Sequence, residues 1–272
     1  DLAFQKSVIE KSGLKIVKAG VVHLNGEYRQ HGKVNYNALF IVADLTDEVL
    51  EAQEGVRQQM QDLKTYLSMD EEKGCECLYR GHNAQCTTFR YSNPDVPEYS
   101  VHDINRIGGS KKLFYDWIDR GIYKLDDIDN PEAQKGAKKA QYEAYTTGRP
   151  LIDHEAIKES LDELVFPLYF FDYEGYSSAI PRFDGFGAYE QVPFQYSLHI
   201  MHESGEVDHK EFLILEPEGD LTLPLIERMR EDFGDEGSVV SWYKSYESQR
   251  NDKLAELHPD HADFLESLND RM

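Results

Sequence analysis

Residues 167–181 read PLYFFDYEGYSSAIP, an apolar run that leads into two acids. The apolar and aromatic residues at 168–171 predict a buried β-strand. Because residues two apart in a strand point to the same side, Asp172 and Glu174 should project together, just past the carboxyl end of this strand. Two adjacent carboxylates repel each other unless a proton or a cation lies between them, and Mg²⁺ and Mn²⁺ both prefer carboxylate oxygens. The pair is therefore either a divalent-metal site or two solvated acids that open a loop.

The segments after this strand predict a mixed sheet with helices packed on it. Strands are expected at 193–203 and 209–216, then a helix at 221–232, a strand at 237–243 and a helix at 245–257. This is the element order of a ribonuclease H-like α/β fold. Such a fold offers a second acid after its fourth strand, where Glu247 stands. The alternative for Glu247 is an ordinary exposed glutamate near a helix N-terminus, where the helix dipole favours it.

Two stretches carry a resemblance to a known family: FFDYEGYSSAIPRFDGFGAYEQVPFQYSLHI (170–200) and GSVVSWYKSYESQ (237–249). They resemble domain-of-unknown-function family 2779 (DUF2779), whose C-terminal part is similar to the DnaQ-like, DEDD-type 3′-to-5′ exonucleases. The resemblance implies that Asp172 and Glu174 form the first exonuclease motif. It places Glu247 at the second motif, where most such enzymes have Asp. The third motif, a Tyr or His followed by an Asp, is expected beyond Met272.

That resemblance also implies an activity. The protein would be a metal-dependent nuclease that hydrolyses DNA or RNA by a two-metal mechanism with Mg²⁺ or Mn²⁺. Asp172 would bridge the two ions, while Glu174 and Glu247 would each hold one. Two alternatives stay open: a decayed, non-catalytic scaffold that binds nucleic acid or a partner protein, and a domain that only positions substrate for a nuclease located upstream.

The first half of the chain predicts a mostly helical region with a short pair of strands, within 14–25 and 37–45. Helices are expected at 1–14, 46–69 with Thr46 as N-cap, 110–121 between Ser110 and Gly121, 131–149 with Pro131 near its start, and 153–164. The opening helix, which carries Gln5, resembles the C-terminal remnant of a RecB-like PD-(D/E)XK nuclease, whose catalytic residues would lie before Asp1. We therefore expect two domains, 1–150 and 151–272, in a fragment of a longer protein.

All three cysteines, Cys75, Cys77 and Cys86, lie in the segment GCECLYRGHNAQC (74–86). An odd number in one cluster does not indicate a secreted disulfide framework. The resemblance to RecB-like nucleases implies that these soft thiolates are ligands of an iron–sulfur cluster, completed by an upstream cysteine. Zinc is the alternative metal, with His82 as an extra ligand. The third interpretation is three free thiols in a polar loop.

The net charge of −22 bears on the class of partner. It repels polyanions and argues against a simple electrostatic nucleic-acid binder. It does not exclude an enzyme that contacts DNA or RNA through bound metal ions and a local basic rim. In such a rim, Arg182 is the basic residue expected near the nucleic-acid backbone. The sequence contains neither a long apolar stretch nor a signal-peptide pattern, so we expect a cytoplasmic protein.

Overall fold

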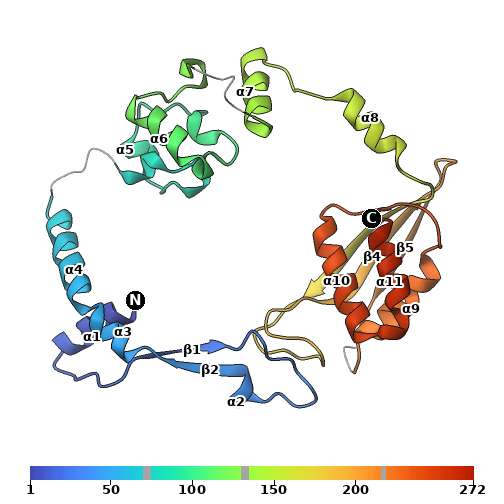
Figure 1. Ribbon diagram of the computed structural model, residues 1–272, viewed down its shortest axis with the longest axis horizontal. Coiled ribbons are helices and arrows are strands. Elements are labelled where there is room, and N and C mark those ends of the chain that lie inside the picture. Colours follow the sequence, from blue (N-terminus) through green and yellow to red (C-terminus); the bar gives the residue numbers. More distant parts are fainter. Residues whose placement is uncertain (70–74, 130–134, 216–218) are drawn as a thin grey trace. The chain divides into compact units, whose positions relative to one another are not determined.

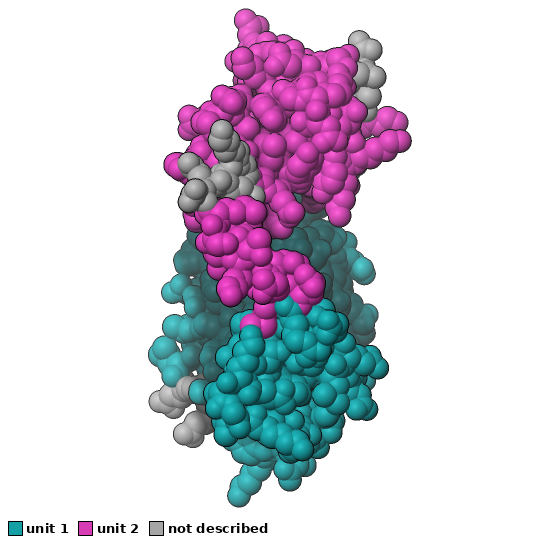
Figure 2. Space-filling view, turned by 90° about the vertical axis from the view of Figure 1, so that its left-hand side faces the viewer, with its two compact units in different colours: residues 1–57, 158–272 teal, residues 58–157 magenta. Residues whose placement is uncertain are grey.

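The computed structural model describes residues 1–69, 75–129, 135–215 and 219–272. They form two compact units, one made of residues 1–57 and 158–272 and the other of residues 58–157 (Figure 2). These units are defined by packing. The predicted division into 1–150 and 151–272 rests instead on resemblance to two kinds of nuclease, and it stays a prediction. None of the helices in the described ranges has the length and apolar character that a bilayer span requires.

The larger unit contains a four-stranded mixed sheet in the order β5–β4–β3–β6 (Figure 1). Its strands are β3 (Leu168–Tyr176), β4 (Val192–Met201), β5 (Val207–Leu213) and β6 (Val239–Val240). β4 is antiparallel to both β3 and β5, whereas β6 pairs with β3 in parallel. The predicted order of strands and helices is therefore confirmed, although β6 is much shorter than the expected 237–243.

Three helices cover one face of this sheet (Figure 1). They are α9 (Thr222–Asp232), α10 (Lys244–Leu257) and α11 (Ala262–Asp270). Burial alternates along β3, because successive strand residues point to opposite faces. The buried core between sheet and helices comprises Tyr169, Phe171, Tyr173, Tyr196, Leu198, Ile200, Leu225, Ile226, Met229, Phe233, Val239, Leu254, Leu265 and Leu268. The opposite face of β3 carries Phe170, Asp172 and Glu174, all exposed.

The N-terminal part of the larger unit contains a two-stranded antiparallel sheet. Its elements are α1 (Leu2–Lys11), β1 (Gly20–Leu24), α2 (Tyr36–Leu39), β2 (Phe40–Asp44) and α3 (Thr46–Glu51). Both strands are shorter than predicted. Residues 36–39 form a helical turn instead, because the Asn35 side chain accepts a hydrogen bond from the backbone N–H of Ala38 at 3.3 Å.

Thr46 is not the predicted N-cap. It is the first residue of α3, and its hydroxyl donates to Asp44 Oδ1 at 2.6 Å. The predicted helix 46–69 is in fact two helices, since α3 ends before Ala52 and α4 (Gln53–Leu67) follows.

A short backbone ladder joins this N-terminal part to the loop between β3 and β4. The Gln30 N–H donates to the Phe186 carbonyl at 3.0 Å, and the Gly185 N–H donates to the Gln30 carbonyl at 2.8 Å. Gly185 has φ +80°, and a Cβ there would lie 2.3 Å from Leu257 Cδ2. Only glycine therefore suits this position, and it lets the loop pack closely on the end of α10.

The smaller unit is mostly helical, as predicted. Besides most of α4, it contains α5 (Phe89–Ser92), α6 (Lys111–Asp119), α7 (Ala137–Thr147) and the start of α8 (His154–Asp162). Ser110 does stand at the N-cap position of α6, but its side chain makes no capping bond. Pro131 lies outside the described residues. The core of this unit comprises Val101, Ile104, Ile107, Phe114, Trp117, Ile118, Ile122, Leu125 and Ile128.

Candidate active site

Asp172 and Glu174 project from the same open face of β3, and both side chains are exposed. The prediction that they lie past the end of the strand is wrong, because β3 continues to Tyr176. The register with β4 shifts between Glu174 and Gly175, where Phe194 of β4 is an extra residue between their partners, and β3 continues past the acids instead of ending at them. The two carboxylates are thus held on a rigid element rather than on a loop.

Gly175 brings the first turn of α10 close to these acids. A Cβ at this position would lie 2.6 Å from Tyr246 Oη and 2.7 Å from Gln191 Oε1. The absence of a side chain therefore lets Tyr246, from α10, approach the backbone of β3 directly after Glu174. The next residue of α10 is Glu247.

Glu247 is only 2% exposed, so the alternative of an ordinary exposed helix glutamate is wrong. Its Oε2 is buried without a hydrogen-bond partner among the described residues. Burial raises the pKa of this carboxyl, and the negative charge of Asp172 raises it further. Asp172 and Glu247 therefore repel each other electrostatically. Oε2 of Glu247 lacks the hydrogen-bond partner that buried polar atoms usually have.

The polar neighbour of Glu247 on the buried face of α10 is fully paired by contrast. Asn251 accepts a hydrogen bond from the Tyr173 hydroxyl at 2.9 Å and donates to Asn269 Oδ1 at 2.8 Å. The unpaired oxygen of Glu247 is thus a local property of the site and not a general feature of this helix.

The three predicted acids do not form one tight cluster. Within the described ranges, Cys75, Cys77 and Cys86 form a group whose ligand atoms all lie within 4.8 Å of one another. The three acids do not form such a group. The structure thus couples Asp172 with Glu247, while Glu174 lies two residues along the same face of β3.

An open depression of about 640 Å³ lies beside Asp172. Its lining residues come from β3, β4 and the end of β6: Phe170, Phe171, Asp172, Ser197, His199, Val240, Ser241 and Trp242. Trp242 is fully exposed, at 100%. Apart from Asp172, sequence reasoning did not assign these residues to the site. Trp242 follows Val240 and Ser241 within the predicted strand 237–243. Its place near the end of that strand is the feature of the sequence that could have assigned it to the site.

Two arginines near the acids are held by aromatic rings. The Arg182 guanidinium lies 5.6 Å from the centre of the Tyr176 ring, on the strand that carries both acids. That of Arg250 lies 4.3 Å from the Tyr246 ring, one turn after Glu247. In the part of the chain that the structure describes, neither arginine forms an ion pair with a carboxylate, so both charges are available to a bound anion. Arg182 was predicted to contact nucleic acid, whereas Arg250 was not.

Comparison with protein families gives a match to a domain of unknown function, DUF2779, over residues 169–272. These residues belong to DUF2779. The matched segment begins in β3 and includes Asp172, Glu174 and Glu247. No curated protein and no solved structure matches the chain. The expected relationships to RecB-like and DnaQ-like nucleases stay predictions.

The cysteine cluster lies in the smaller unit, outside the DUF2779 segment. Cys75 Sγ and Cys86 Sγ are 4.0 Å apart, and the three thiols could hold a metal ion. Hydrogen bonding to the Thr88 side chain, and then to Cys77, lowers the pKa of Cys86 to about 7. His82 Nδ1 pairs with Asp103 Oδ1 at 2.8 Å, and the group that could hold a metal ion consists of the three cysteines, so His82 as an extra ligand stays a prediction.

Gln5 is exposed on α1. Its assignment to the glutamine motif of an upstream nuclease stays a prediction.

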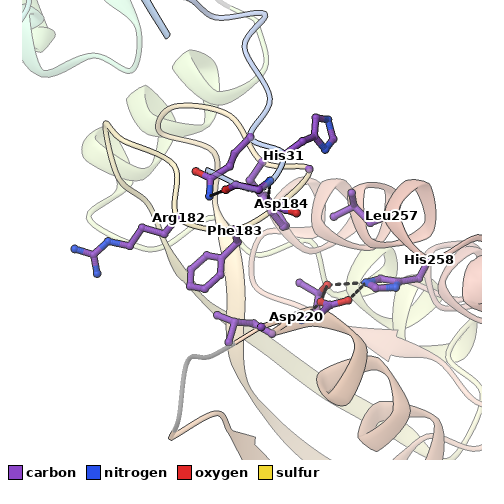
Figure 3. Close-up of a pocket in the computed structure, with 14 residues that line it drawn as sticks. His31, Arg182, Phe183, Asp184, Asp220, Leu257 and His258 are labelled. Carbon is purple, nitrogen blue, oxygen red and sulfur yellow. Dashed lines mark hydrogen bonds and ion pairs between the residues drawn. The ribbon is translucent and has the colours of Figure 1, made fainter. Parts of the chain in front are cut away.

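A second concavity, of about 590 Å³, lies at the opposite end of α10 from Glu247, against Leu257 and His258. Figure 3 shows His258 next to Asp220, with Nε2 3.6 Å from Asp220 Oδ2, while Arg182 extends away from these side chains. The Thr222 hydroxyl donates to Asp220 Oδ1 at 2.8 Å, so His258 Nε2 must donate to Thr222 Oγ1 at 2.6 Å. This chain of hydrogen bonds ties the start of α9 to the end of α10, and none of the three predicted acids of the DUF2779 segment lines the concavity.

Proposed function

We propose that the DUF2779 segment is a metal-dependent nuclease that hydrolyses phosphodiester bonds of DNA or RNA, with 3′-to-5′ exonuclease polarity. The observation that carries this proposal is the buried Glu247 carboxyl, whose Oε2 has no hydrogen-bond partner among the described residues and which interacts electrostatically with Asp172. A buried charge without a partner is costly, and a divalent cation would relieve both the missing partner and the repulsion between the acids. Carboxylate oxygens on a rigid strand and at a helix start suit Mg²⁺ or Mn²⁺.

The sheet topology supports a ribonuclease H-like fold for this segment. Three consecutive antiparallel strands and a fourth strand parallel to the first, in the order β5–β4–β3–β6, agree with that arrangement. In it, acids are expected on the first strand and after the fourth. Asp172 and Glu174 on β3 and Glu247 after β6 fit those places.

Each acid has its own role in the proposed site. Asp172 would help to hold both ions, and Glu174 and Glu247 would each help to hold one. Bound ions would activate water and stabilise the leaving oxygen of the phosphodiester. Because Asp172 alone must reach both ions, Glu174 and Glu247 do not need to be neighbours. The absence of a tight three-carboxylate cluster in the described residues is compatible with that division of roles.

The proposal for the smaller unit is a metal centre on Cys75, Cys77 and Cys86, either an iron–sulfur cluster or zinc. Three thiols whose sulfur atoms lie within 4.8 Å of one another support either choice, because thiolates bind both metals strongly. Analysis of iron, sulfide and zinc in anaerobically purified protein distinguishes them. Iron with stoichiometric sulfide indicates the cluster, zinc alone indicates a zinc site, and neither metal contradicts the proposal.

A non-catalytic scaffold that binds nucleic acid or protein is the second candidate. The net charge of −22 favours the protein-binding form of this candidate, because such a charge opposes the approach of polyanionic nucleic acid. In a third arrangement, catalysis belongs to an upstream nuclease and this half positions the substrate.

Calorimetric titration of Mn²⁺ tests the preferred proposal, beside Mn²⁺-dependent hydrolysis of labelled oligonucleotides. We expect binding and hydrolysis in the unaltered chain, and loss of both in Asp172→Ala. Glu203→Gln is the matched control, because this exposed acid lies in the turn between β4 and β5. Metal binding without hydrolysis supports the scaffold or the positioning role, and no Mn²⁺ binding in any variant removes the two-metal proposal.

A further inference from the structure

We infer that Trp242 stacks on an unpaired nucleobase and thereby selects a single-stranded end over a duplex. This inference rests on the proposed nuclease function, and it adds a specificity-determining residue to the same site. Trp242 lies in the turn between β6 and α10. At 100% exposure it is a large ring that packs on nothing within the described chain, beside Tyr243 at 66%. A fully exposed indole buries no apolar surface within the described chain, and its ring is open to a ligand.

The position of Trp242 relative to the acids gives it a role. Trp242 and Asp172 line the same open depression, together with Phe170 and His199. Phe170 pairs in register with His199, and His199 stacks on His209 with ring centres 4.4 Å apart. A row of rings therefore crosses the open face of the sheet next to the proposed metal-binding carboxylate.

The charges around the acids complement one strand of nucleic acid. Along the open face of β3, Phe170 lies on one side of Asp172, while Arg182, over Tyr176, lies beyond Glu174 on the other. Trp242 lines the same depression as Phe170 and Asp172. A base stacked on Trp242 would leave its phosphate at the acids and the next phosphates toward the arginines. Phosphate contacts position the strand, and the metal ions neutralise the acids that would otherwise repel it.

The chemistry of an exposed indole favours an unpaired base. In a duplex, the faces of the bases are covered by stacking, whereas the faces of a single strand are open to aromatic side chains. Such stacking tolerates every base, because each has a π-face. The inferred ligand is thus a single-stranded end of DNA or RNA without sequence preference.

Tryptophan fluorescence reports this contact directly, because the chain has two tryptophans and Trp117 is buried in the smaller unit at 2% exposure. A short oligothymidylate, titrated with Ca²⁺ in place of Mg²⁺ or Mn²⁺ to neutralise the acids without hydrolysis, should quench the exposed tryptophan. The same oligonucleotide annealed to its complement should quench it much less. In Trp242→Ala, where only Trp117 emits, the quenching should vanish.

Affinity is measured in parallel by the anisotropy of an end-labelled oligothymidylate. Trp242→Ala should weaken binding about 5- to 150-fold, as expected for removal of one stacking ring, and Trp242→Phe should recover most of the loss. Tyr189→Asn is the matched control, since Tyr189 is an exposed ring of the same segment, at 66%, that does not line the depression.

The possible outcomes separate this inference from the proposed function. Absence of quenching by the single strand, equal quenching by the duplex, or unchanged affinity of Trp242→Ala overturns the role of Trp242, even if the chain hydrolyses DNA or RNA. Quenching and a loss of affinity in Trp242→Ala, without Mn²⁺-dependent hydrolysis, support the stacking role and contradict the nuclease proposal.

Discussion

At the residue scale, the decisive group is the Glu247 carboxyl. It is buried, one of its oxygens is unpaired within the described structure, and the nearby Asp172 adds repulsion. Such an arrangement costs stability in the absence of a cation, because burial removes water from the charged form and one of its oxygens has no hydrogen-bond partner to replace that water. A binding site that is destabilising when empty is a common property of functional sites.

The stability of the metal-free protein should therefore respond to Glu247→Gln. The folded carboxyl holds its proton to higher pH than the unfolded one, since its pKa is raised from 4.5. Its contribution to stability is full below the unfolded pKa and is lost as the pH rises through the folded value. Glutamine resembles the protonated form, so the variant should be more stable than the unaltered chain at pH 7, by about 1 kcal/mol. The difference should disappear near pH 4.

Denaturant unfolding at both pH values, without divalent metal, measures this effect. Glu203→Gln should leave the free energy of unfolding unchanged at either pH, because Glu203 is exposed. A Glu247→Gln variant that is no more stable than the unaltered chain at pH 7 would show that the burial of this acid carries no penalty.

At the scale of elements, the contact between β3 and α10 organises the site. The side chains of Tyr246 and Gln191 fill the space where a side chain of residue 175 would lie. The register between β3 and β4 shifts at the same point, between Glu174 and Gly175. The buried positions of α10 are Glu247, Asn251 and Leu254, of which two are polar. Hydrophobic periodicity therefore could not identify the face of this helix that lies against the sheet.

Gly175→Ala should separate these two elements. Its Cβ would lie 2.6 Å from Tyr246 Oη and 2.7 Å from Gln191 Oε1, so α10 must shift, at a cost of about 1–3 kcal/mol. Mn²⁺ affinity should fall as Glu247 moves, which calorimetry measures. Adding Tyr246→Phe should restore part of the stability, because it removes the nearer oxygen.

A glycine with open surroundings provides the control. No atom lies within 4 Å of a Cβ built on Gly26, so Gly26→Ala should change neither stability nor Mn²⁺ affinity. If Gly175→Ala behaves like this control, close approach of Tyr246 is not what positions the acids.

At the scale of the whole molecule, two units carry two different candidate metal sites. The acids belong to the unit of residues 1–57 and 158–272, and the cysteines belong to the unit of residues 58–157. Each unit has its own hydrophobic core. Loss of one metal should therefore affect the stability of one unit.

Cys86→Ser should lower the thermal unfolding temperature of the smaller unit only, by about 5 °C or more in metal-loaded protein. The physical reason is that a metal bound to three thiolates in the folded unit stabilises it by the free energy of binding. Buried Trp117 reports the unfolding of this unit by fluorescence in a Trp242→Phe background. Thr87→Ala, at an exposed neighbouring position, is the control. An equal change in both variants, or a change in the larger unit, would contradict a metal centre on the cysteines.

The sequence by itself determined the features that depend on local pattern. Alternation along residues 168–174 was sufficient to place Asp172 and Glu174 on one face, because the period of a strand is two. Apolar runs and turns also predicted the order of strands and helices in the DUF2779 segment, and the presence of all three cysteines within residues 75–86 predicted their cluster. Lengths were less accurate, as in β6, since strand ends depend on pairing partners.

Only the tertiary structure decided which of these residues act together. Burial of Glu247 beside Asp172, exposure of Trp242 and the ladder between Gln30 and residues 185–186 depend on segments far apart in the chain. His82 illustrates the same limit, because its partner Asp103 comes from another turn of the smaller unit. A one-dimensional pattern records the direction of a side chain relative to its own element, whereas burial and partners are set by the packing of elements against one another.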